Sequence, residues 1–197
     1  MKGEKNPKEI FERYKRRELD KLSNFYIKTG VSLEEAAVLG LLESLTGIKL
    51  IKIETSEDEY SSDKYDIPHK MNHYKLNETG NIVRIYFYSI EPLIGLIPKK
   101  LCSLHHLEAL HLNYNSINLI PKKIGNLRSL KILDLSNNKL NRIPKSITKL
   151  KQLEKLYLYG NKIKETPKFL KKHPLLDKID IFNNLIFRET HKDDFKT

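Results

Sequence analysis

The sequence predicts an α/β solenoid: a right-handed arc with a parallel concave sheet, short convex returns and an N-terminal helical cap. Three observations predict it. The second half of the chain repeats itself every 23 residues. Within each period apolar residues stand two apart, as they do on one side of a strand. The first 53 residues, by contrast, carry helix-start signatures and no repeat.

The repeat consists of five columns of residues, each spaced by 23 positions. Three columns are leucine or isoleucine, one is asparagine and one is proline. The members are Leu107, Leu130, Leu153 and Leu176; Leu110, Leu133, Leu156 and Ile179; Leu112, Leu135, Leu158 and Ile181; Asn115, Asn138, Asn161 and Asn184; and Pro98, Pro121, Pro144 and Pro167.

Each column has a physical role in the predicted fold. Leu133 and Leu135 stand two apart, so both enter the core from one side of a short strand. Pro144 fixes the backbone φ on the convex return, where no sheet hydrogen bond is needed. Ile147 and Leu150 then close the core from behind. Because no repeat buries its own leucines alone, stability is a sum over neighbours and both ends need covers.

The unit L-x-x-L-x-L-x-x-N-x-[LI]-x-x-I-P-x-x-I-x-x-L-x-x, complete from Leu130 to Gln152, resembles the leucine-rich repeat family. The resemblance is to the 23-residue intracellular form with I-P opening the convex segment, and it covers residues 82–186. It implies that each asparagine amide bonds backbone groups of its own turn and of the neighbouring repeat. Ile90 stands where the first repeat should have asparagine, which is typical of a capping repeat. The I-P form looks like that of Ras-pathway repeat proteins, which implies a small GTPase, phosphatase or kinase partner.

The chain divides into four predicted regions. Residues 1–53 form the helical cap, 54–73 a flexible linker, 74–187 the repeat domain, and 188–197 a frayed tail. The cap has a helix over 6–22, a second helix from the Ser32 cap to Gly47, and a strand near 48–53. Residues 74–88 predict a hairpin that turns at 77–80. An independent binding or signalling domain is the alternative interpretation of residues 1–81.

Composition places the chain in the cytoplasm. Cys102 is its single cysteine, which excludes an intramolecular disulfide and suits a reducing compartment. We expect no secretory signal and no transmembrane segment, because no apolar run approaches the ~20 residues that span a bilayer. The net charge of +11 is uneven. Residues 1–81 carry 14 basic and 15 acidic residues, whereas 82–190 carry 20 and 8.

No motif predicts an enzyme, a cofactor or a metal. The P-loop, G-x-S-x-G and kinase signatures are all missing. His69 and His73 have H-x-x-x-H spacing but follow Pro68 and lack a third ligand, so we expect a solvated linker. His105 and His106 are expected to face solvent, and Cys102 lacks catalytic partners.

We therefore expect surface residues to carry the function. The chain is predicted to be a non-enzymatic interaction module, an adaptor or regulatory subunit. Positions flanking the strand leucines project from the concave face. Their aromatic and charged members are the predicted partner-binding residues: Tyr86, Tyr88, His111, Tyr114, Asp134, Tyr157, Tyr159, Asp180 and Phe182. Aromatics are enriched at binding hot spots, although they are also good strand formers, which is the competing interpretation. A second hypothesis is polyanion binding, to nucleic acid or an anionic membrane, through the lysine-rich convex surface. Nucleic acid is the less favoured partner, because lysine outnumbers arginine there.

Overall fold

The computed structural model describes residues 27, 30–46, 49–53, 72–88, 95–170 and 179–185. The predicted helix over 6–22 and the predicted tail over 188–197 lie outside these residues, as does most of the predicted linker. The division into four regions stays a prediction.

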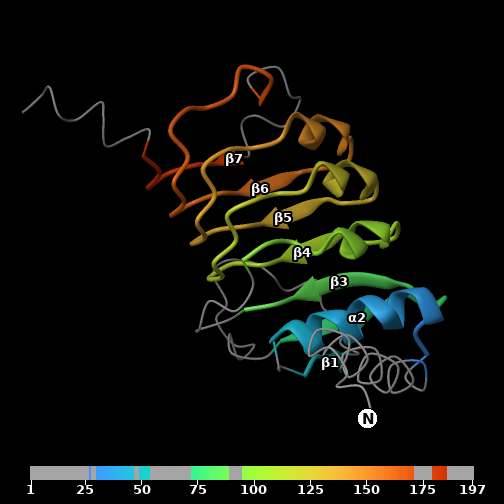
Figure 1. Cartoon of the computed structure of the whole chain (residues 1–197). Coiled ribbons are helices and arrows are strands. Elements are labelled where there is room, and N and C mark those ends of the chain that lie inside the picture. The colour runs from blue at the N-terminus through green and yellow to red at the C-terminus, as the bar shows by residue number, and fades with distance from the viewer. Residues whose placement is uncertain are drawn as a thin grey trace, which may run out of the picture.

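Within the described residues the chain forms one seven-stranded sheet whose strands follow in sequence order (Figure 1). Every neighbouring pair is parallel except β2 and β3, which form the predicted hairpin. The strands are β1 (Ile51–Ile53), β2 (His73–Leu76), β3 (Ile82–Tyr86), β4 (Ala109–His111), β5 (Ile132–Asp134), β6 (Lys155–Tyr157) and β7 (Ile179–Asp180). The predicted leucine-rich repeat arc is confirmed.

The convex returns are short 3₁₀ segments that begin directly after a repeat proline. They are η1 (Lys99–Ser103), η2 (Lys122–Asn126) and η3 (Lys145–Lys149). Pro98, Pro121 and Pro144 precede them with φ of −59°, −68° and −75°, the range that the proline ring imposes. The 3₁₀ segments stack on one side of the sheet and enclose the core between the two layers (Figure 1).

The predicted leucine columns fill this core. Leu110 and Leu133 are fully buried and Leu156 is 2% exposed. Ile147 and Leu150 close the core from the convex side with no exposed surface. Each buried leucine contributes roughly 1.5–3 kcal/mol relative to an exposed one, so the stacked columns supply most of the stabilisation of the fold.

A ladder of buried asparagine amides joins the repeats. Asn138 Nδ2 donates to the Leu112 carbonyl of the preceding repeat at 2.9 Å and to the Leu135 carbonyl of its own repeat at 3.0 Å. Its Oδ1 accepts from the Ile117 N–H at 2.9 Å. Asn161 and Asn184 repeat the arrangement one and two periods later. The amide role that the family resemblance implied is confirmed.

The N-terminal cap holds the sheet through two buried carboxylates on α2 (Leu33–Thr46), which lies beside β1–β3 (Figure 1). Glu35 Oε2 accepts from the Ile82 N–H at 2.9 Å, and Glu43 Oε1 accepts from the Leu50 N–H at 2.6 Å. The predicted Ser32 cap is present, with its Oγ accepting from the Glu35 N–H at 3.4 Å. Apolar residues of α2, Leu39 and Leu42 among them, join the same core as the repeats.

Two sequence expectations need correction. The predicted strands over 109–113, 132–136, 155–159 and 178–182 are shorter, and the strand predicted over 84–88 keeps its length but lies two residues earlier, over 82–86. His73 was expected in a solvated linker, yet it begins β2 and is 3% exposed. Its ring stacks on Tyr86, with centroids 4.3 Å apart, which explains the burial.

The ladder predicts a clear stability effect at Asn138. Asn138→Ala leaves the Ile117 N–H without its buried acceptor and removes one of the two amides that donate to the Leu112 carbonyl, so unfolding should become easier by about 1–3 kcal/mol. Urea unfolding of both proteins measures it. The control Lys139→Ala removes an exposed neighbour and should stay within about 0.5 kcal/mol of wild type. Equal midpoints for all three proteins would contradict the ladder.

The buried Glu35 predicts a pH-dependent stability. Burial raises the pKa of Glu35 above 4.5, although the Ile82 N–H and His106 act to lower it. The folded state therefore binds this proton more tightly than the unfolded state. That contribution to stability is present below about pH 4.5 and is lost as the pH rises through the folded pKa.

Glu35→Gln keeps an acceptor and removes the titration. Wild type should gain stability relative to this variant as the pH falls from about 7 to about 4.5, measured by urea unfolding at each pH. A gain of wild type over the variant on raising the pH would contradict the assignment.

Candidate functional site

Three register neighbours on β2, β3 and β4 form a buried aromatic stack. Tyr86 stacks between His73 and His111, with ring centroids 4.3 and 4.2 Å apart. Tyr86 and His111 are each only 6% exposed. Little of either side chain is therefore open to a partner, and a role of these two residues in binding stays a prediction. The repeat period carried no signal for His73, which β2 places beside Tyr86 in the sheet register.

The equivalent positions on β5, β6 and β7 hold two aspartates and a tyrosine, all partly buried. Tyr157 lies between Asp134 and Asp180, its register neighbours on β5 and β7. Burial raises the pKa of Tyr157, and the two carboxylates raise it further. Both aspartates also turn the chain, since each Oδ1 accepts from the backbone N–H two residues on, at 2.9 and 3.1 Å. These three residues thus offer two carboxylates on either side of a protonated phenol.

Four aromatic side chains stand at the rim where the strands end; we call them the aromatic ridge: Tyr88, Tyr114, Tyr159 and Phe182. Tyr114, Tyr159 and Phe182 are 49%, 40% and 66% exposed. Tyr88 is partly buried, and its ring centroid lies 5.1 Å from that of Tyr114. The structure thus pairs Tyr88 with Tyr114 and places Asp134 and Asp180 on either side of Tyr157.

Strand β6 ends at Tyr157 and β7 at Asp180, each two residues before the ridge aromatic that follows. Backbone pairing continues past these ends, because the Asn137 N–H donates to the Tyr159 carbonyl at 2.6 Å and the Gly160 N–H to the Phe182 carbonyl at 3.1 Å. Strand propensity therefore stays the competing interpretation for Tyr159 and Phe182, but not for Tyr114, whose backbone is left-handed. The rings of Tyr114, Tyr159 and Phe182 are exposed and so add nothing to the core.

Tyr114 occupies a backbone position that disfavours it. Its φ is +56°, in the left-handed region, and the equivalent residues of later repeats are Asn137, Gly160 and Asn183 with φ of 53°, 67° and 54°. Asparagine and glycine suit this region, whereas a bulky residue there is an outlier. Strained residues of this kind cluster at functional sites. The exposed Tyr114 ring is therefore the strongest local indication of a site.

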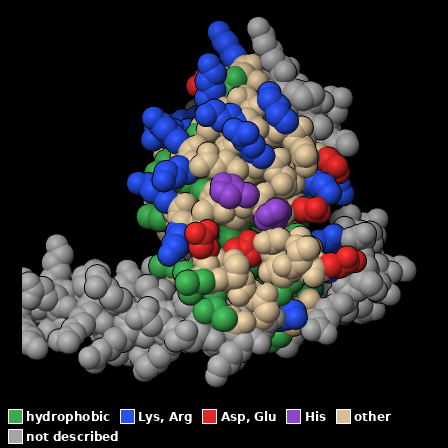
Figure 2. Space-filling model, turned by 90° about the vertical axis from the view of Figure 1, so that its right-hand side faces the viewer, with side chains coloured by type: hydrophobic (Ala, Val, Ile, Leu, Met, Phe, Trp, Pro, Cys, Tyr) green, Lys and Arg blue, Asp and Glu red, His purple; other side chains and the backbone are tan. Residues whose placement is uncertain are grey.

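The convex face differs sharply in charge. Figure 2 shows the side with the 3₁₀ segments, where blue Lys and Arg side chains gather over the later repeats in the upper part. The 3₁₀ segments η1, η2 and η3 contain no acidic residue. Their lysines are exposed and include Lys99, Lys100, Lys122, Lys123, Lys145 and Lys149. The later repeats thus present a basic convex surface, while acidic side chains gather lower on the same side (Figure 2).

The described residues offer little for catalysis. They contain no group of three or more metal-ligating side chains. Cys102 is buried, and burial raises the pKa of its thiol to about 11, which suppresses the reactive thiolate. His105 and His106 are exposed, as predicted. No helix among the described residues is long and apolar enough to cross a membrane.

The family model for a leucine-rich repeat region matches residues 94–193, just over half of the sequence. The chain belongs to the leucine-rich repeat family. Leucine-rich repeat domains generally mediate protein–protein interaction and are typically non-enzymatic. No curated protein sequence matches this chain.

Solved leucine-rich repeat proteins share parts of the fold. The BIR2 ectodomain of Arabidopsis thaliana is 25% identical with a TM-score of 0.50, over 62% of this chain and 69% of its own. A leucine-rich repeat protein of Leptospira interrogans is 32% identical with a TM-score of 0.45, over 56% of this chain. This chain covers only 29% of that protein. The SOBIR1 ectodomain of Arabidopsis is 20% identical with a TM-score of 0.49, over 78% and 94%.

The left-handed backbone at Tyr114 predicts a measurable difference between two substitutions. Tyr114→Asn and Tyr114→Ala both remove the ring, but only asparagine suits a φ of +56°. The asparagine variant should be more stable than the alanine variant by about 1 kcal/mol, measured by urea unfolding. The control is Asn141→Ala compared with wild type. Asn141 is exposed and has no positive φ, so no such preference for asparagine is expected there. Equal stability of the two Tyr114 variants would show that the position is not strained.

Proposed function

We propose that this leucine-rich repeat chain is a non-enzymatic adaptor or regulatory subunit that binds a protein partner on its concave side. Contact is made by the aromatic ridge and by the acidic pair Asp134 and Asp180. The observation that carries the proposal is the exposure of Tyr114, Tyr159 and Phe182, which packing in the core does not explain.

The geometry suits an extended interface on successive repeats. Tyr159 and Phe182 follow neighbouring strands, which lie about 4.8 Å apart, and Tyr114 lies two repeats earlier. Tyrosine and phenylalanine bury large areas and tyrosine is enriched at interface hot spots. Three rings spaced along the rim therefore provide anchors for one partner surface rather than one small ligand.

The charge of this face selects a partner that presents Lys or Arg. Asp134 and Asp180 flank Tyr157, and their carboxylates add to the effect of burial in raising the pKa of that phenol. A guanidinium or ammonium group placed there gains both a carboxylate partner and an aromatic face. Because these groups are partly buried, such a contact is less screened than one on an open surface.

The proposed class of partner rests only on the resemblance to the 23-residue I-P form of the repeat. A small GTPase, a phosphatase or a kinase is the partner class that the I-P repeat form favours, and cytoplasmic localisation accompanies it. Both remain predictions, and the BIR2 and SOBIR1 domains that share parts of the fold are ectodomains. Polyanion binding through the convex lysines also remains a prediction, and the salt dependence of any binding distinguishes it from ridge binding.

The test is affinity capture from a native lysate with the immobilised full chain, followed by measurement of the captured partner with purified proteins. Tyr159→Ala combined with Phe182→Ala should weaken that partner by about 2 kcal/mol or more, the usual hot-spot scale, because both anchors are removed. The fold should persist, since both side chains are exposed.

The matched control reverses charge on the other side of the molecule. Lys99→Glu combined with Lys100→Glu alters two exposed residues of η1 and should leave capture intact. Loss of binding in this convex variant, with retention in the double ridge variant, would overturn the proposal in favour of the polyanion hypothesis.

A further inference from the structure

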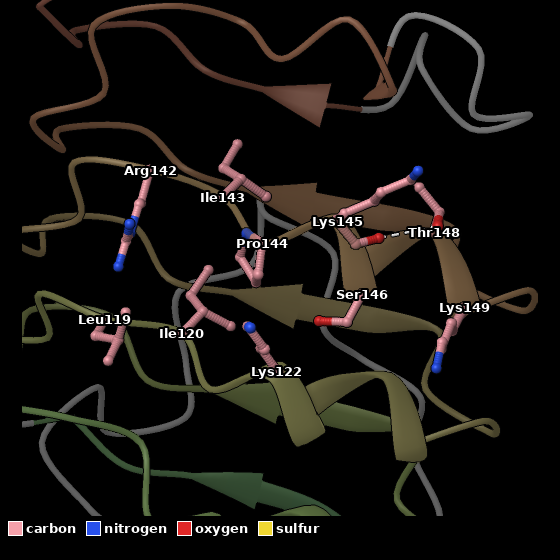
Figure 3. A pocket seen from close by; sticks show the side chains of 10 residues that line it. All are labelled: Leu119, Ile120, Lys122, Arg142, Ile143, Pro144, Lys145, Ser146, Thr148 and Lys149. Carbon is pink, nitrogen blue, oxygen red and sulfur yellow. Dashed lines mark hydrogen bonds between the residues drawn. The ribbon is translucent and has the colours of Figure 1, made fainter.

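A groove of about 700 Å³ lies on the convex side between η2 and η3 (Figure 3). Its apolar wall is made by Leu119, Ile120, Ile143 and Pro144. Leu119 is 44% exposed, so this wall is open to a ligand. Pockets that bind small molecules typically measure about 300–1,000 Å³ and are mostly apolar with a few placed polar groups. The groove has this size and this mixed lining.

The polar part of the lining has a single sign. Lys122, Arg142, Lys145 and Lys149 line the groove, and no Asp or Glu does. Among the described residues none of these four side chains has an ion-pair partner, whereas Lys131 on the neighbouring surface pairs with Glu108 at 3.1 Å. Cations gathered without a counter-charge repel one another, and an anion bound between them relieves that repulsion.

A buried hydroxyl marks the position of the anion. Ser146 Oγ is inaccessible to solvent and has no hydrogen-bond partner among the described residues. Figure 3 shows the Ser146 hydroxyl and the Lys122 ammonium pointing toward each other in the middle of the groove. The neighbouring Thr148 hydroxyl differs, because it donates to the Lys145 carbonyl at 2.9 Å. A buried polar atom without a partner is destabilising unless a ligand or water satisfies it.

We propose that this groove binds an organic phosphate monoester. The phosphoryl group lies between Lys122 and Ser146, whose hydroxyl donates to a phosphate oxygen once its side chain rotates into the groove, while Arg142 and Lys149 lie at the rim. The organic part of the ligand covers Leu119 and Pro144. A phosphoryl group carries close to two negative charges and three acceptor oxygens, which matches several cations and one donor.

A local site accounts for the groove better than a diffuse polyanion surface does. Lys123 and Lys151 are exposed basic residues next to Lys122 and Lys149, but they do not line the groove. A duplex or a membrane would use all of these lysines together, and it would leave the Ser146 hydroxyl and the apolar wall without a role. The proposal thus concerns a small molecule, and it is independent of the ridge.

The experiment titrates phenyl phosphate and inorganic phosphate into the full-length chain by calorimetry at low ionic strength. Phenyl phosphate should bind about tenfold more tightly, since its ring buries about 50 Å² of apolar surface on the wall. Lys122→Ala combined with Lys149→Ala should weaken phenyl phosphate by at least tenfold. Lys123→Ala combined with Lys151→Ala removes the same charge from outside the groove and should change the affinity less than twofold.

Ser146→Ala separates a ligand contact from a structural role. Because the hydroxyl has no partner in the free protein, its removal should leave the melting temperature unchanged or raise it, while phenyl phosphate weakens about tenfold. Equal weakening by the two lysine pairs would show a diffuse electrostatic surface and overturn the site. Failure of phenyl phosphate to bind, or an affinity indifferent to Ser146→Ala, would overturn it as well.

Discussion

The fold depends on the asparagine amide that joins each repeat to the one before it. A short strand leaves backbone groups of the following turn without sheet partners, and the core side of that turn is closed to water. The amide of Asn138 satisfies three such groups on two repeats at once. It therefore fixes both the turn and the stacking of the repeats, and every surface feature inherits its spacing from this ladder.

The same constraint explains the irregular N-terminal end. A ladder that begins without a preceding repeat needs other partners for its first backbone groups. Asn72 supplies one, because its Oδ1 accepts from the Tyr88 N–H at 2.6 Å, and Glu35 supplies another at Ile82. The cap thus covers apolar side chains and also continues the hydrogen bonding, which accounts for two buried carboxylates on a helix that could have been wholly apolar.

How much the sequence predicts depends on whether a residue is fixed by the repeat. The leucine columns, the prolines and Asn138 recur every 23 positions, so their burial and bonding follow from one unit. The burial of Tyr86 and His111 does not follow from the repeat. It depends on a stack that begins with His73, which lies outside the repeat on an antiparallel strand and contacts Tyr86. Tyr86 in turn contacts His111. The groove at Ser146 likewise arises from variable positions on two successive convex segments, whose packing no column records.

Because the repeat fixes the interior, the variable positions are free to carry different side chains on the two sides. The concave rim carries exposed aromatics beside Asp134 and Asp180, whereas η1, η2 and η3 carry lysines and no acid. With a net charge of +11, the molecule repels a basic partner at long range. Salt limits such long-range forces to about 8–10 Å, so Asp134 and Asp180 attract a basic partner only after it has come close. A basic partner is then oriented away from the convex lysines and toward the rim, where the rings provide the contact area.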